Sequence, residues 1–189
     1  NADIAGEINY IDLNGYRFQN ILLDGHVKNR NFDGLATVRD PNLGLDFAGG
    51  FDFSGDTILS DFKTKITNAN VFALGYSEAE MAILNLEADI DFDVYEDSWW
   101  DGTINIFNIT YESIDRFYFF DTLQLASTNV KNVHHDRVKS RLLSAEINGQ
   151  YDLPDVFNAF YAEYLDFNRL TFKTIPRPQV NFTYDVNLH

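Results

Sequence analysis

Apolar and polar residues alternate without interruption from Leu84 to Val94. Every second position in this run is apolar, and the positions between carry acidic or amide side chains. Because successive side chains of a strand point to opposite faces, the run predicts a strand with one apolar and one acidic face. The stretch from Leu43 to Phe53 repeats the pattern, with Asp46 and Asp52 on its polar side. Both runs therefore predict a sheet with one apolar surface and one acidic surface.

Further strands are expected where apolar or alternating runs lie between turn signals. Asn14-Gly15 and Asp33-Gly34 are typical of hairpin turns, and Asp40-Pro41-Asn42 is typical of a tight turn in which proline fixes φ. The expected strands are 4–13, 16–23, 26–29, 35–39, 43–53, 58–67, 81–95, 103–111, 117–126, 130–139 and 142–151, with one more in the tail VNFTYDVNL. Together they predict a curved antiparallel meander.

Residues 153–167 break this two-residue period. Their apolar side chains recur at helical spacing, with Asp152 placed to cap the segment and Pro154 in its first turn. We expect one amphipathic helix here, packed against an edge or end of the sheet, where it hides unpaired strand donors. The apolar positions are Val156, Phe157, Phe160, Tyr161, Tyr164 and Leu165.

Length and charge limit the classes of protein that fit. The 189 residues suit a single β-rich domain, 1–189, and no linker-like segment divides them. The net charge of -15 and the scattered Lys and Arg residues disfavour nucleic acid as a partner. The chain has no cysteine, which leaves no disulfides and no thiol chemistry. The chain begins without the regions of a signal peptide, so for an exported protein we expect the targeting segment to be cleaved or upstream.

Catalytic and metal-binding patterns are weak. His134 and His135 are adjacent, and neighbouring residues of a strand point to opposite faces, so we interpret them as residues of a surface turn rather than as metal ligands. Asp89 and Asp91 invite a glycosidase or calcium hypothesis, but a solvated polar face explains them. The sequence thus predicts neither an enzyme nor a bound cofactor or metal.

Two tryptophans offer a competing interpretation. Trp99 and Trp100 next to Asp101-Gly102 could stack against a sugar ring, although such a pair more often fills a packing position. The alternative function is accordingly a closed β-sandwich that binds a glycan or a protein in the cell envelope, with no lipid groove.

The apolar face itself is the remaining signal. Leaving one Leu, Ile or Phe in water forgoes roughly 1.5 to 3 kcal/mol, so a large apolar face requires a cover. A second sheet, a bilayer or bound lipid could each provide it. We expect an open half-pipe or an incompletely closed sandwich whose apolar groove takes lipid chains. The residues expected to line this groove are Leu43, Leu45, Phe47, Phe51, Phe53, Leu84, Leu86, Ile90, Phe92, Val94, Ile104 and Ile106.

Several longer stretches carry a resemblance to a known family. They are DGTINIFNITYE from Asp101, DTLQLAS from Asp121 and RLLSAEINGQYDLPDVFNAFYAEY from Arg141. Upstream, GLATVRDPNLGLDFAGGFDFSG from Gly34 and ITNANVFALGY from Ile66 look like a preceding repeat unit. These stretches resemble the TamB branch of the AsmA-like proteins, in the form found in Bacteroidota.

The resemblance implies that the chain is an internal piece of a long envelope protein anchored in the inner membrane. Members of that family look like a rolled sheet with an apolar interior, in the periplasm, thought to conduct phospholipids towards the outer membrane. TamB-like members also work with a barrel partner related to BamA in outer-membrane biogenesis. The family offers no catalytic residues to carry over. The chain lacks the family's N-terminal membrane helix and any segment that would dock on a barrel, so the resemblance implies barrel binding only through other parts of a longer protein.

Overall fold

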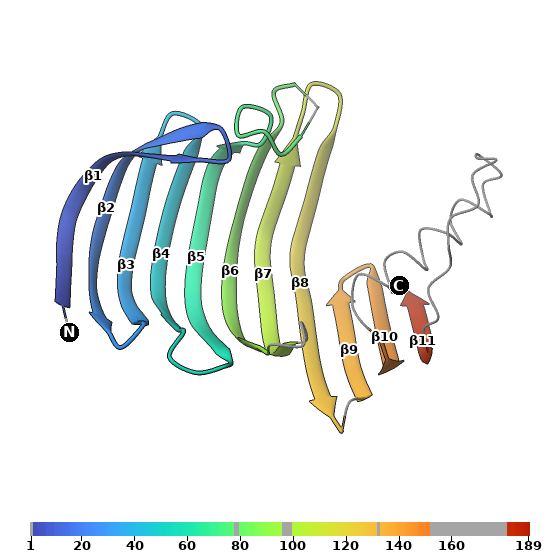
Figure 1. The fold of residues 1–189 in the computed structure, drawn as a ribbon. Coiled ribbons are helices and arrows are strands. Elements are labelled where there is room, and N and C mark those ends of the chain that lie inside the picture. Colours follow the sequence, from blue (N-terminus) through green and yellow to red (C-terminus); the bar gives the residue numbers. More distant parts are fainter. Residues whose placement is uncertain (1, 78–79, 96–99, 132, 152–180) are drawn as a thin grey trace.

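The protein is a single curved antiparallel β-sheet. The computed structural model describes residues 2–77, 80–95, 100–131, 133–151 and 181–189. Each strand pairs with its neighbours in the sequence, in the order β1 to β11, and the sheet does not close into a barrel (Figure 1). The strands are β1 (Ala2–Leu13), β2 (Tyr16–Lys28), β3 (Asn31–Asp40), β4 (Leu43–Asp52), β5 (Ile58–Asn70), β6 (Ile83–Val94), β7 (Trp100–Glu112), β8 (Phe117–Val130), β9 (Val133–Ser140), β10 (Leu143–Gln150) and β11 (Asn181–Leu188).

The predicted meander is confirmed, including the two long alternating runs, which form β4 and β6. The described residues form one layer, which agrees with the open half-pipe of the two architectures expected. The helix expected over residues 153–167 lies outside the described residues.

The first turns are set by residues that tolerate positive φ. Asn14 and Gly15, with φ of 51° and 82°, connect β1 to β2 as predicted. The turn predicted at Asp33-Gly34 is wrong: the chain turns instead at Asn29 and Arg30, with φ of 48° and 65°. The two strands predicted on either side of residues 24 and 25 are therefore one strand, β2, and residues 33 and 34 lie inside β3.

The next turn keeps the predicted proline. Pro41 and Asn42 connect β3 to β4, and the Asn42 backbone N–H donates to Asp40 Oδ1 at 2.8 Å. The Tyr16 hydroxyl also donates to Asp40 Oδ1, at 2.5 Å, which ties the β1–β2 hairpin to this turn.

Asparagines with positive φ interrupt three of the strands. Asn20, Asn68 and Asn108 have φ between 51° and 53° and lie in β2, β5 and β7. The pairing register shifts beside Asn68 and Asn108, which identifies β-bulges there. Asn85 on β6 links the two: its Oδ1 accepts from the Asn68 N–H at 2.7 Å, and its Nδ2 donates to Thr110 Oγ1 at 3.0 Å. Because bulges bend and twist a strand, they re-aim the strand ends beyond them.

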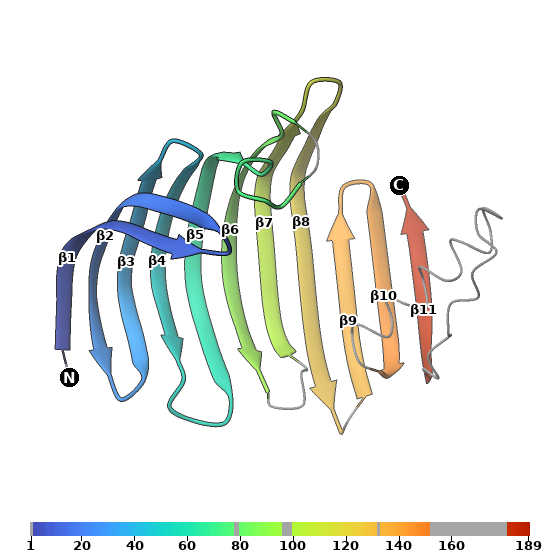
Figure 2. The same ribbon diagram turned by 45° about the horizontal axis from the view of Figure 1, so that its top comes forward.

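Above the bulges, two segments lean over one side of the sheet. Figure 2 shows the tip of the β1–β2 hairpin and the connection after β5 coming forward of the strands behind them. Leu74 and Ala82 of that connection are buried together with Ala69, which pairs with Leu84 on the apolar side. These segments therefore cover the upper end of the apolar side.

Candidate apolar binding face

Strand register places apolar residues in rows that cross the sheet at right angles to the strands. One of these, which we name the central row, has one residue from each of the eleven strands and contains only apolar side chains and glycine. Eleven strands spaced ~4.8 Å apart make this row about 48 Å long, against about 15 Å for half of a bilayer's hydrocarbon core. Its members are Ile4, Gly25, Gly34, Gly49, Phe62, Ile90, Ile104, Leu125, Val138, Ala145 and Val186.

Two further rows flank the central row on the same side of the sheet. The first flanking row consists of Gly6, Leu23, Ala36, Phe47, Thr64, Ala88, Ile106, Leu123 and Ser140. The second flanking row consists of Ala2, Val27, Phe32, Phe51, Ser60, Phe92, Gly102, Ser127, Asp136, Ile147 and Tyr184. We call the surface formed by these three rows the apolar face.

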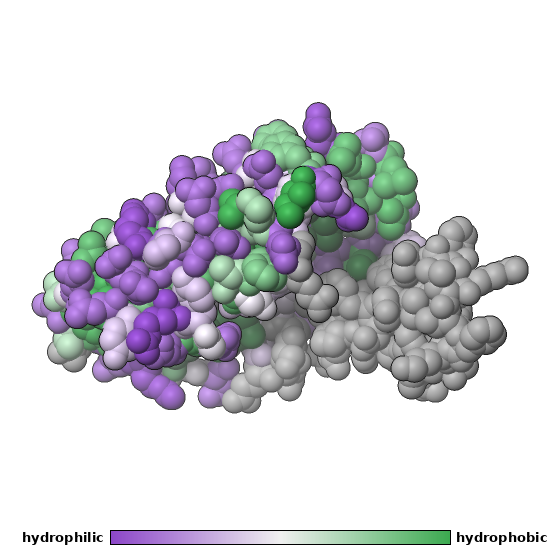
Figure 3. Space-filling view, turned by 90° about the horizontal axis from the view of Figure 1, so that it is seen from above, coloured by the Kyte–Doolittle hydropathy of each residue, from purple (hydrophilic) through white to green (hydrophobic). Residues whose placement is uncertain are grey.

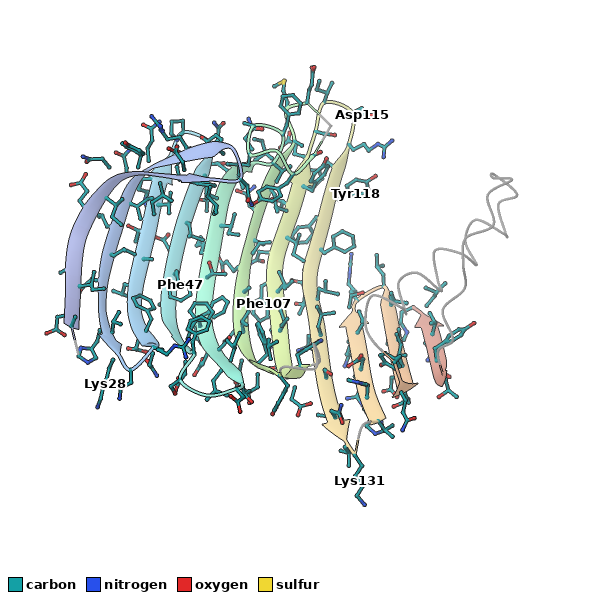
Figure 4. All side chains as sticks on the ribbon, in the orientation of Figure 1. Lys28, Phe47, Phe107, Asp115, Tyr118 and Lys131 are labelled. Carbon is teal, nitrogen blue, oxygen red and sulfur yellow. The ribbon has the colours of Figure 1, made fainter. Side chains whose placement is uncertain are left out.

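Four phenylalanines from β3, β4 and β5 form the centre of the apolar face. The rings of Phe47 and Phe51 stack at 5.7 Å between centroids, and Phe62 lies 5.1 Å and 5.0 Å from them. Phe32 joins through Phe47 at 6.3 Å. Contacts at these separations stabilise an aromatic pair beyond the area that it buries. Phe47 is labelled near the middle of the sheet in Figure 4.

Glycines next to these rings let the backbones approach closely. A Cβ on Gly49 would lie 2.3 Å from the Asp61 carbonyl oxygen and 2.5 Å from the Phe62 Cα. A Cβ on Gly25 would lie 2.8 Å from the ring of Phe32, so that ring occupies the space over the glycine.

The sequence-predicted groove residues lie on the apolar side of the sheet, within the apolar face or next to it. Six of them are members of the three rows: Phe47, Ile106, Ile90, Ile104, Phe51 and Phe92. Leu45 and Leu86 both pair with Ile66 and lie next to the first flanking row. The other four lie towards the strand ends: Leu43 at the start of β4, Phe53 just after its end, Leu84 opposite Tyr111, and Val94 opposite Trp100.

The predicted groove residues are neither fully buried nor bare. Eleven of the twelve are half-buried, and Phe53 is 44% exposed. A sealed sandwich core would hold such side chains below a tenth exposed, as the sheet does only at a few positions such as Ala88. In the part of the chain that the structure describes, no second sheet lies over this face. The face is therefore partly open to a guest molecule.

The opposite side of the sheet is polar, and ion pairs between neighbouring strands hold its register. Lys63 Nζ lies 2.9 Å from Asp89 Oδ2, and Lys65 Nζ lies 2.8 Å from Glu87 Oε1. The two residues of each pair are directly opposite across β5 and β6. The hydrogen bond to the carboxylate raises the pKa of each lysine. A one-residue slip would break both pairs and turn the apolar residues towards water.

Seen from above, the described strands form an arch, with mostly hydrophilic residues over its outer surface and hydrophobic ones in the recess beneath (Figure 3).

The polar side also has a shallow hollow of about 640 Å³ next to Leu35, Ala48 and Phe107, bordered by the two lysine ion pairs. Phe107 is labelled on β7 in Figure 4.

One polar cluster interrupts the apolar face between β8 and β10. Ser127 and Asp136 are directly opposite each other, 1% and 9% exposed. The Tyr151 hydroxyl donates to Asp136 Oδ2 at 2.7 Å, and the Tyr151 ring lies 5.0 Å from the ring of His134. Burial, and then the neighbouring Asp136, raise the pKa of Tyr151, so its hydroxyl stays protonated.

The other candidate residues from the sequence do not come together in one site. His134 and His135 lie on opposite sides of β9, inside a strand rather than in a surface turn. Among the described residues, no group of three or more His, Cys, Asp or Glu is placed to hold a metal ion. Trp100 is half-buried, and its ring forms a T-shaped contact with the Phe92 ring at 6.2 Å between centroids, whereas Trp99 lies outside the described residues. Asp89 is bound to Lys63, as expected for a solvated polar face.

Residues that the sequence reasoning missed complete the face. Phe32 and Phe62 belong to the aromatic centre, and Leu125 and Val138 extend the central row. Phe62 could have been found, because residues 58, 60, 62, 64 and 66 alternate with the charged residues of β5. The Ser127–Asp136 pair depends on the register of two strands and has no local signal.

Comparisons complete the description of the chain. No family model, no curated protein and no solved structure matches it. Within the part of the chain that the structure describes, no helix is long and apolar enough to cross a membrane. The fold and face define the class as an open, curved antiparallel sheet with one apolar side.

Proposed function

We propose that this chain is a periplasmic segment of a TamB/AsmA-like envelope protein, whose apolar face carries the acyl chains of phospholipids between the inner and outer membranes. The observation that carries the proposal is the central row, an apolar path across all eleven strands with half-buried residues along it. Hydrocarbon on such a surface needs no specific hydrogen bonds, so chains can slide along it. The resemblance in sequence supports the same assignment.

The dimensions of the face suit this task. At about 48 Å, the central row is about three times as long as one acyl chain in a bilayer leaflet. Several lipids could therefore lie on the sheet at once. Because each covered Leu, Ile or Phe gains roughly 1.5 to 3 kcal/mol, hydrocarbon is a favourable cover for the row.

The proposal includes the wider assembly implied by the resemblance. The full-length protein would be anchored in the inner membrane and would take part in outer-membrane biogenesis. A BamA-related barrel would bind through parts outside this chain. The function is transport without catalysis.

Native mass spectrometry after gentle extraction tests the proposal. We expect the chain to retain phospholipid, and Phe92→Asp or Leu86→Asp to reduce that loading several-fold because a carboxylate repels hydrocarbon from the face. Leu35→Asp is the matched control, since Leu35 is 53% exposed on the polar side.

Two results would overturn the assignment. One is a wild-type chain without lipid after extraction and after incubation with vesicles. The other is unfolding of both face variants, seen by circular dichroism while Leu35→Asp stays folded, because that pattern is typical of a sealed core.

A further inference from the structure

The Ser127–Asp136 pair has hydrogen-bonding capacity that the described residues do not use. Asp136 Oδ2 accepts from Tyr151, but Asp136 Oδ1 and Ser127 Oγ are buried and find no hydrogen-bond partner among those residues. Buried polar atoms in folded proteins nearly always have partners. Two such atoms on facing residues of neighbouring strands therefore point to a ligand that binds between them.

The charge of the site specifies the kind of ligand. Asp136 is the only charged residue in the three rows of the apolar face. The nearest cations along β9, Arg137 and Lys139, belong to the polar side, where Arg137 Nε binds Glu146 Oε1 at 2.9 Å. A buried carboxylate is stable only when it is paired or hydrogen-bonded. The missing partner is therefore a cation that donates hydrogen bonds.

The geometry favours a small cation with more than one N–H. Cβ atoms of directly opposite residues lie about 4.5 to 5.5 Å apart, so one nitrogen can reach oxygens on both side chains. The next residue in the row is Gly102, which places no side chain beside Ser127, although its own backbone lies close against β6. The Tyr151 hydroxyl completes the site by holding the second carboxylate oxygen.

We propose that Ser127 and Asp136 bind the primary ammonium head group of an amphiphile whose hydrocarbon chains lie on the neighbouring apolar rows. The inference rests on the proposed function, to which it adds a preferred class of lipid. A quaternary ammonium has no N–H to donate and bulky methyl groups, so the site discriminates against it. An otherwise unselective face thereby acquires one selective position.

The test compares phosphatidylethanolamine with phosphatidylcholine of identical acyl chains, which differ in the presence of N–H donors. The chain is incubated with vesicles containing equal amounts of both lipids, and the bound lipids are counted by native mass spectrometry. We expect a preference for phosphatidylethanolamine of about tenfold, the factor that one charged hydrogen bond provides. Asp136→Asn and Ser127→Ala should bring the ratio towards one while total lipid binding persists.

The control is Asp91→Asn, which removes a carboxylate from the polar side and should leave the preference unchanged. Equal binding of both lipids by the wild-type chain overturns this inference and leaves the proposed function intact. Absence of any bound lipid overturns the proposed function as well. If Asp136→Asn fails to fold, the inference is tested by the ratio of the two bound lipids in the wild-type chain and in Ser127→Ala.

Discussion

Glycines shape the apolar face where neighbouring strands approach each other most closely. Gly49 has φ of 137° and Gly102 has φ of 127°, a region that side-chain-bearing residues rarely adopt. At each position a Cβ would lie within 2.3 Å of a carbonyl oxygen of the next strand. These glycines are required by the backbone, because a side chain at either position would collide with the neighbouring strand.

Gly49→Ala therefore tests the backbone geometry at the centre of the face. We expect the free energy of unfolding to fall by at least about 1–3 kcal/mol, because the new Cβ meets both an unfavourable φ and the β5 backbone. Urea denaturation measures the change.

Gly6→Ala is the matched control for this substitution. A Cβ there has no atom within 4 Å, so we expect a change of no more than about 0.5 kcal/mol. Equal losses in the two variants would contradict the close approach of β4 and β5.

The second flanking row combines apolar residues with a buried polar pair. Phe92 and Gly102 precede Ser127 and Asp136 across successive strands, so an apolar path leads directly to a buried carboxylate. Such an arrangement suits a ligand with a hydrocarbon chain and a polar end better than it suits a pure hydrocarbon.

At the scale of elements, electrostatics make the pairing of β6 with β7 sensitive to pH. Asp93 lies directly opposite Asp101, with Asp91 two residues away on the same side of β6. Burial and then these two carboxylates raise the pKa of Asp93. Because the pKa of Asp93 is higher in the folded state than in the unfolded state, ionisation of this carboxyl destabilises the fold. The loss of stability is complete above the folded-state pKa and absent below the unfolded-state pKa, which is near 4.

Asp93→Asn should accordingly stabilise the protein near neutral pH. We expect a gain of up to about 1 kcal/mol at pH 7, the scale of other partly exposed charge interactions, declining as the pH falls through the pKa of Asp93. Urea denaturation of both proteins across pH 3 to 8 measures it. A gain that persists at pH 3, or none at pH 7, would show that repulsion at this strand pair is not the cause.

Strand identity is the part of the fold that the sequence predicts best. Strict alternation in β4 and β6 determines which side of each strand is apolar, because one face of the sheet must be shielded from water. Turn positions are less certain. Asp33-Gly34 matches a hairpin signal but lies inside β3, because the chain has already turned at Asn29 and Arg30, which both adopt positive φ.

Bulges are harder to predict because their cause is not local. Asn68 and Asn108 are polar residues at positions that the alternation assigns to the apolar side, and the pairing with neighbouring strands shows that the register shifts there. The sequence predicts a curved sheet but not these bulges, and in the structure the upper end of the β1–β2 hairpin bends over the apolar side (Figure 2).

The same limit applies to the candidate site. The twelve predicted groove residues are on the apolar side because they follow from alternation within single strands. Their order into rows, and the contribution of Phe62 from β5 and of Asp136 from β9, depend on register across many strands. Pairing over such distances leaves no trace in a single stretch of sequence.

At the scale of the whole molecule, the open sheet has two unprotected aspects. One is the apolar face, and the other is the pair of free edges at β1 and β11, whose outer backbone groups have no partner among the described strands. Natural sheets usually shield such edges. Extension of the sheet by a neighbouring strand would lengthen the rows of the apolar face in the same direction and preserve the proposed path.

The central claim is that hydrocarbon reaches the apolar side of the sheet and not the polar side. Ile104 and Thr103 are consecutive on β7, so their side chains point to opposite sides although their positions along the sheet are nearly the same. Placing a photo-reactive phenylalanine at either position in cells that express the protein tests the claim directly. The account predicts phospholipid crosslinks from position 104 and few from position 103. Equal crosslinking at both positions, or crosslinks from position 104 to protein alone, would contradict it.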